Sequence, residues 1–91
     1  MKYFTAPLFR RIFKKLDFQK REEVKRAMSE LSAFFDSGIR SEGLGLKRLH
    51  GNIWEIRATL KDRILFSFEK DGIFFLIVGN HDEVRKYLKN L

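Results

Sequence analysis

The sequence predicts an α+β fold, a small single domain over residues 1–91 in which an antiparallel sheet packs against a helical hairpin. Apolar residues recur at helical spacing in the first half of the chain, and three short apolar runs separated by tight turns occupy the second half. A second hydrophobic core would need roughly another hundred residues, so only one core is expected. The expected order is strand, two helices, three strands, helix.

The N-terminal part is expected to begin with a short strand at residues 2–4 and to continue as an amphipathic helix. Thr5 is placed to cap this helix, and Pro7, the only proline, suits its first turn because that position needs no backbone N–H. Four apolar residues then follow at the spacing of one helix face: Phe9, Ile12, Phe13 and Leu16.

A second helix is expected to start near Asp17, to run to about Asp36 and to stop at Gly38, which suits a left-handed C-terminal residue. Its apolar stripe consists of Val24, Ala27, Met28, Leu31, Phe34 and Phe35. The opposite faces of both helices hold many Lys, Arg and Glu residues, which is typical of a solvated surface with i, i+4 pairs. Residues 38–52 contain four glycines and are expected to form a loop.

Three β-rich runs follow and are joined by short turns: Ile53 to Thr59, Arg63 to Glu69 and Ile73 to Val78. The pair Asp71-Gly72 is the clearest turn signal, since glycine supplies the positive φ that a tight hairpin needs. These features predict an antiparallel meander. The third run is apolar at every position and is expected to be a central strand covered on both faces.

The C-terminal segment is expected to form a short helix capped by Asp82. Its buried stripe would consist of Val84, Tyr87, Leu88 and Leu91.

In the first strand of the meander, alternation places Trp54 on the core side, which favours a packing role over a base-stacking role.

The charge balance favours a polyanionic partner. Nineteen basic and twelve acidic residues give a formal charge of +7, which attracts nucleic acid or an acidic protein, although simple solubility is the alternative explanation. With no Cys and only two His, we expect no disulfide, thiol nucleophile, metal site or cofactor. No stretch approaches the roughly 18 uninterrupted apolar residues of a membrane span, so a cytoplasmic location without membrane contact is expected.

The predicted order of elements and four segments together resemble the RelE/ParE toxin superfamily. These segments are Leu44-Gly-Leu-Lys-Arg-Leu-His-Gly51, Ile53-Trp-Glu-Ile-Arg57, Asp62-Arg-Ile-Leu-Phe66 and Val78-Gly-Asn-His-Asp-Glu-Val84. The resemblance implies the toxin of a type II toxin–antitoxin pair, held silent by an antitoxin. RelE-like members cut messenger RNA in the ribosome, which makes a metal-free, ribosome-dependent endonuclease the expected function. ParE-like members inhibit DNA gyrase, which is the alternative.

The resemblance marks Arg57, Arg63 and His81 as catalytic residues. By strand parity the two arginines point to the same side, and strands that pair through the turn at 60–62 would bring them close enough to hold one phosphate. Histidine exchanges protons readily at neutral pH, so His81 is expected to act as a general acid or base. The alternative is a histidine that caps or packs the last helix.

Flanking phosphates are expected to contact Lys47, Arg48 and Lys61, which would position the substrate without reading its sequence. Glu55 shares a strand face with Arg57 and could act as a general base, but an ion pair with an arginine is the favoured interpretation. His50 is assigned no role.

The sequence departs from the family pattern at the start of the last helix. Arg85 stands where many members have a terminal tyrosine used in cleavage, and it is assigned to substrate binding. Tyr87 follows two residues later, about 200° around the helix, and is therefore expected to face the core.

Overall fold

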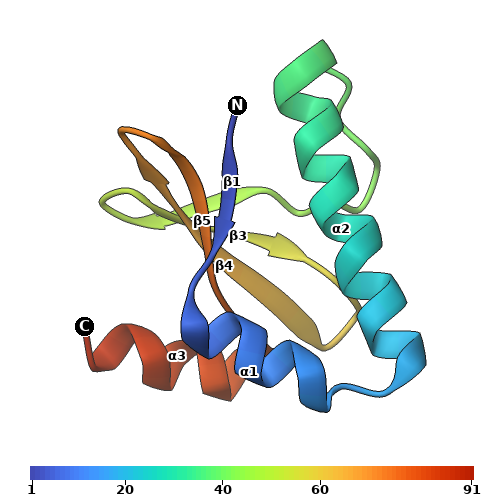
Figure 1. Ribbon diagram of the computed structural model, residues 1–91. Coiled ribbons are helices and arrows are strands. Elements are labelled where there is room, and N and C mark those ends of the chain that lie inside the picture. The colour runs from blue at the N-terminus through green and yellow to red at the C-terminus, as the bar shows by residue number, and fades with distance from the viewer.

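A five-stranded sheet forms the centre of the computed structural model, which describes all residues from Met1 to Leu91 (Figure 1). The strands lie in the order β1-β5-β4-β3-β2. Only the pairing of β1 with β5 is parallel. The elements along the chain are β1 (Tyr3–Thr5), α1 (Pro7–Lys15), α2 (Phe18–Ser37), β2 (Lys47–His50), β3 (Ile53–Arg57), β4 (Asp62–Glu69), β5 (Gly72–Asn80) and α3 (His81–Lys89).

The start of α1 differs from the prediction that Thr5 caps this helix. Thr5 is the last residue of β1, and Ala6 occupies the cap position without a side-chain hydrogen bond. The hydroxyl and carbonyl of Thr5 accept hydrogen bonds from the Arg10 guanidinium instead. The Ala6 N–H donates to the Phe75 carbonyl at 2.9 Å, so the sheet pairing continues up to the helix and leaves Thr5 no freedom to cap it.

The predicted ends of α2 are confirmed. The Asp17 carboxylate accepts a hydrogen bond from the Lys20 N–H at 2.8 Å, and Gly38 closes the helix with a φ of +75°. The two helices are joined at Leu16 and Asp17 and diverge from there, so that α1 lies along the end of the sheet while α2 rises beside β3 (Figure 1). None of the helices is long and apolar enough to cross a membrane.

The predicted loop at residues 38–52 is wrong over Lys47–His50, which form the edge strand β2. Lys47 pairs with Glu55 and Arg48 with Trp54, before a bulge shifts the register. Leu49 is the only apolar residue of this strand, so alternation could not reveal it. It is a strand because the edge of β3 supplies its hydrogen-bonding partners.

The predicted meander of β3, β4 and β5 is confirmed, and its two faces carry separate clusters of buried side chains. The larger cluster lies on the face of α1 and α2, where Trp54 also packs, as predicted. The smaller consists of Ile53, Leu65, Ile77 and Val84. The strand β5 contributes to both clusters, as expected of a strand covered on both faces. The short β1 adds a parallel partner along the outer edge of β5 and so makes β5 an internal strand, although β4 is the middle strand of the five.

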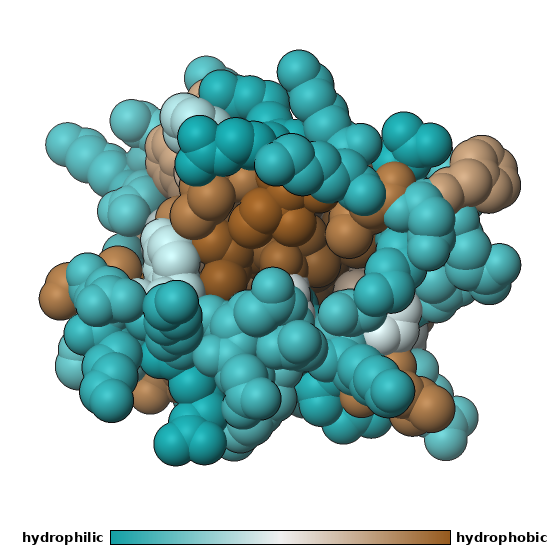
Figure 2. All heavy atoms as spheres, turned by 90° about the horizontal axis from the view of Figure 1, so that it is seen from below, coloured by the Kyte–Doolittle hydropathy of each residue, from teal (hydrophilic) through white to brown (hydrophobic).

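The helix α3 begins at His81, and the prediction that Asp82 caps it is wrong. Asn80 is the cap: its side chain accepts a hydrogen bond from the Glu83 N–H at 2.9 Å, and the Glu83 carboxylate accepts one from the Asn80 N–H at 2.8 Å. The helix packs against β4 and β5 through Val84, with Tyr87 and Leu88 partly buried beside it, as predicted. Leu91, predicted to belong to the same stripe, is exposed because it lies beyond the end of the helix. Seen from the side of α1 and α3, apolar side chains line a hollow that polar side chains surround (Figure 2).

Substitution of Gly72 by alanine is expected to lower the free energy of unfolding by about 1–3 kcal/mol. Its φ is +148°, and an added Cβ would collide with the Lys2 carbonyl, which accepts the hydrogen bond that joins β1 to β5. Urea denaturation would measure the change. Gly43→Ala is the matched control, because Gly43 also has a positive φ, +86°, but open space around it. An equal loss in both variants would contradict the proposed collision.

Candidate active site

A cavity of about 640 Å³ opens between α3 and the strands β2, β3 and β4. Basic side chains surround it, together with a single carboxylate, that of Glu55. The basic lining residues are Lys47, Arg57, Arg63, His81 and Arg85. Apolar side chains, including Leu49 and Val84, form the rest of the lining. The cavity therefore combines an apolar floor with a positively charged rim.

The strands position two of the arginines. Arg57 and Arg63 are directly opposite each other in the register of β3 and β4, on the face that α3 covers, as strand parity predicted. Opposite residues of an antiparallel pair have Cβ atoms about 4.5–5.5 Å apart, which suits two guanidinium groups that share one anion. Arg57 is exposed and takes part in no salt bridge, so its charge is available to a ligand.

Glu55 forms an ion pair with Arg63. Its Oε2 lies 3.7 Å from the Arg63 Nε, and the two side chains are only 16% and 23% exposed, respectively. This geometry agrees with the ion-pair interpretation of Glu55. The same carboxylate also lines the cavity.

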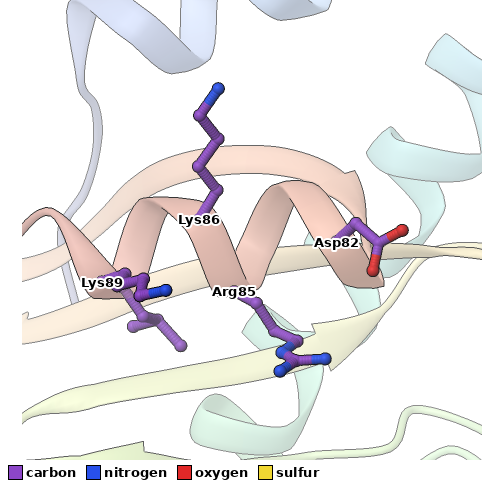
Figure 3. Close-up of a pocket in the computed structure, with 5 residues that line it drawn as sticks. Asp82, Arg85, Lys86 and Lys89 are labelled. Atoms are coloured by element: carbon purple, nitrogen blue, oxygen red, sulfur yellow. The ribbon is translucent and has the colours of Figure 1, made fainter.

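His81 is the first residue of α3 and is exposed at the cavity. Since Asn80 provides the cap, the alternative that His81 caps the helix is excluded. Arg85 lies one turn further along the helix, so both side chains reach the same cavity. Figure 3 shows Arg85 extending from α3 toward the neighbouring strand, while Lys86 points to the opposite side of the helix.

Two predicted substrate-binding residues lie outside the cavity. Arg48 is next to Lys47 but on the other face of β2, opposite Trp54, and its Nε donates to the Gly51 carbonyl at 2.8 Å. Lys61 lies in the turn between β3 and β4, in a depression that it shares with α2 residues such as Lys20. Arg48 lies outside the cavity because strand alternation turns it to the other face of β2. Lys61 lies outside it because the turn between β3 and β4 points toward α2. The structure thus brings Lys47 and Arg85 to the cavity, but neither Arg48 nor Lys61.

Gly45, which belongs to the Leu44–Gly51 segment but was assigned no role, also lines the cavity. Its φ is +63°, and an added Cβ would lie 3.3 Å from the Arg57 Cβ. The neighbouring Leu44 carbonyl accepts a hydrogen bond from the Arg57 N–H at 2.8 Å. The segment before β2 therefore packs against the stem of Arg57, and the glycine at position 45 was the only sign of this close approach in the sequence.

The arrangement suits the binding of a phosphodiester and the transfer of a proton beside it. Two guanidinium groups can hold the non-bridging oxygens of a phosphate and stabilise the extra charge of a pentacoordinate phosphorus. An exposed imidazole at the same cavity can donate or accept a proton. The chain has no cluster of three or more His, Asp or Glu side chains that could hold a metal ion.

Solved structures with a similar fold are toxins of toxin–antitoxin systems. One is the RelB-RelE antitoxin-toxin complex from Methanococcus jannaschii, with 20% identity, a TM-score of 0.67 and coverage of 92% of this chain and 96% of that chain. Another is a YoeB/ParE toxin from Agrobacterium tumefaciens, with 15% identity, a TM-score of 0.66 and coverage of 89% and 99%. A third is YafQ from E. coli strain BL21(DE3), with 10% identity, a TM-score of 0.65 and coverage of 91% and 96%.

No protein-family model matches the sequence, and no curated protein is significantly similar to it. The likeness therefore lies in the three-dimensional structure and extends over almost the whole chain. The chain has the fold of the RelE/ParE toxins, as its sequence motifs predicted. One fold can host different activities, so the function of this protein depends on the residues of its cavity.

Proposed function

We propose that this protein is the toxin of a type II toxin–antitoxin pair and cleaves ribosome-bound messenger RNA without a metal ion. The observation that supports this proposal is the meeting of Arg57, Arg63 and His81, from three different elements, at one cavity. In this proposal the protein acts in the cytoplasm, where ribosomes and their messengers are found.

The proposed reaction is attack of a ribose 2′-hydroxyl on the adjacent phosphorus. The new O–P bond closes a 2′,3′-cyclic phosphate, and the bond to the 5′-oxygen of the next nucleotide breaks. Arg57 and Arg63 would hold the non-bridging oxygens as negative charge accumulates on them. One group must take the 2′-hydroxyl proton and another must protonate the leaving oxygen. His81 is assigned to one of these transfers, and the Glu55 carboxylate is the candidate for the first.

The remaining basic residues at the cavity fit a positioning role. Lys47 and Arg85 stand on either side of it, on β2 and α3, where they can bind the phosphates next to the one that is cut. Such contacts would hold the RNA without reading its sequence. They would also make binding sensitive to salt, because every neutralised phosphate releases counterions.

The proposed partner in the resting state is an antitoxin. The RelB-RelE structure is an antitoxin-toxin complex, and a YoeB-YefM structure from Staphylococcus aureus is a heterotetrameric toxin-antitoxin complex. The charge of +7 on this chain favours an antitoxin with an acidic segment, whose apolar side chains would complement exposed apolar surface of the toxin.

Inhibition of DNA gyrase is the second candidate function, and one observation favours it. The cavity contains no tyrosine, since Arg85 occupies the place of the family's terminal tyrosine and Tyr87 packs against the core. A gyrase inhibitor would use the same fold and basic surface for protein binding and would need none of the proposed proton transfers.

Induction of this protein alone is expected to arrest growth, with protein synthesis stopping before DNA replication. The physical reason is the arrangement of two arginines and a histidine at one cavity, which suits RNA cleavage better than docking alone. Incorporation of labelled leucine and labelled thymidine after induction would measure the order of events. If thymidine incorporation collapses first while translation continues, gyrase inhibition is the correct function.

A further inference from the structure

The turn between β3 and β4 is fastened to α2 by Arg26. The Arg26 Nη2 donates to the Ala58 carbonyl at 2.7 Å, a contact between residues 32 positions apart in the sequence. On its own helix the guanidinium is held by Glu30 at 2.8 Å and Glu23 at 3.3 Å. The hydrogen bond with Glu30 is the main reason why the pKa of Arg26 is raised above its ordinary value. The ion pairs with Glu23 and Glu30 and the bond to the Ala58 carbonyl therefore orient the guanidinium toward the turn.

A second contact with α2 and a set of internal bonds fix the rest of this turn. The Lys20 Nζ lies 3.5 Å from the Asp62 Oδ2, and the same carboxylate oxygen accepts a hydrogen bond from the Thr59 hydroxyl at 2.9 Å. The Thr59 Oγ1 in turn accepts from the Asp62 N–H at 2.9 Å and the Lys61 N–H at 3.2 Å. Ala58, whose carbonyl accepts the hydrogen bond from Arg26, is itself buried. The turn is therefore constrained at both ends from the α2 side.

The Arg63 guanidinium lies against the same turn, on the cavity side of the sheet. Its Nη1 is 3.4 Å from each of three carbonyl oxygens, those of Thr59, Leu60 and Asp62. Its Nε faces Glu55 at 3.7 Å. The position of the Arg63 charge therefore depends on where the turn presents its carbonyl groups.

We propose that Arg26 is a positioning residue, which holds the 58–62 turn in place and thereby sets the position of the Arg63 guanidinium in the cavity. The inference rests on the proposed cleavage function for its catalytic readout. Arg26 is not among the residues that line the cavity. It acts through the turn, and a displacement of about 1 Å at a reacting group can lower a rate by about 10²-fold.

Substitution of Arg26 by methionine keeps the apolar stem and removes the contact with the Ala58 carbonyl. We expect the single-turnover rate of cleavage at saturating ribosome to fall about tenfold, with the half-saturation concentration unchanged. Arg26→Lys should recover part of the rate, because an ammonium group can still donate to that carbonyl. Lys25→Met is the matched control: it removes the same charge from α2 but breaks only an exposed pair with Glu22, and should cleave at the parent rate.

A double-mutant cycle distinguishes positioning from general loss of structure. If Arg26 acts through Arg63, then Arg26→Met should not slow cleavage further in the Arg63→Ala background, measured over long time courses. Thr59→Val loosens the turn from within and should behave in the same way. Independent effects that multiply would overturn the inference, as would a parent rate for Arg26→Met. If Arg63→Ala alone cleaves at the parent rate, the proposed function fails and this inference fails with it.

Discussion

Replacement of Arg63 by alanine is expected to slow single-turnover cleavage of ribosome-bound messenger by about 10²- to 10³-fold. Arg63 is directly opposite Arg57 and lies between Glu55 and the carbonyl groups of the 58–62 turn, so its charge is held in place before substrate arrives. A preorganised charge of this kind needs no rearrangement as the phosphorus gains negative charge. Its loss should therefore appear in the rate of the chemical step.

The comparison with Lys61→Ala isolates this effect. Both substitutions remove one positive charge from neighbouring positions, but Lys61 lies outside the cavity. Lys61→Ala should cost less than about tenfold, which corresponds to about 1.4 kcal/mol of barrier, and should act mainly through salt-sensitive binding. Circular dichroism melts should show both variants folded. Near-parent cleavage by a folded Arg63→Ala protein would remove the basis for the proposed active site.

Substitution of His81 by alanine is expected to lower the same rate by about 10²- to 10⁴-fold, the usual effect of losing a general acid or base. His81 is exposed at the first position of α3, and the capping bonds between Asn80 and Glu83 do not involve its side chain. The helix should therefore form without it. The melting temperature is expected to change little, so a slow variant would indicate lost chemistry.

His50 provides the control for this experiment. It is the only other histidine of the chain and is exposed at the end of β2, where it lines none of the cavity. His50→Ala should cleave at the parent rate. If His81→Ala also cleaves at the parent rate, another group transfers the proton, and Glu55→Gln becomes the decisive variant. If Glu55 is the general base, Glu55→Gln should lose cleavage activity while its stability is unchanged. If Glu55 is only an ion-pair partner, Glu55→Gln should lose little activity.

Much of the fold could be predicted because local patterns are strong where one face of an element is buried. Alternation in residues 53–69 separated the two faces of β3 and β4, and helical spacing marked the buried stripe of α2. Side-chain periodicity gave no prediction where an element buries few of its side chains. The strand β2 is exposed along most of its length, so its residues give no alternation and its existence depends on the neighbouring β3.

Some features of the candidate site also follow from local sequence patterns, and others depend on tertiary packing. Strand parity alone predicted that Arg57 and Arg63 share a face, because alternation along a strand is a local property. The family resemblance drew attention to His81 and Arg85. That these residues meet at the cavity depends on the packing of α3 against Leu65 and Ile77, which no local pattern reveals. Arg48 shows the opposite case, since the unrecognised strand β2 turns it to the other face.

The sequence by itself determined the class of fold, the two faces of the sheet and the shared side of Arg57 and Arg63, since each of these follows from side-chain periodicity within one or two elements. Only the tertiary structure decided that the order of strands places β4 at the centre and that Arg26 reaches the turn behind Arg63. In the sequence, Arg26 is one cation among many on an exposed helix face. Its contact with the Ala58 carbonyl spans 32 residues, and only the packing of α2 beside the sheet brings those groups together.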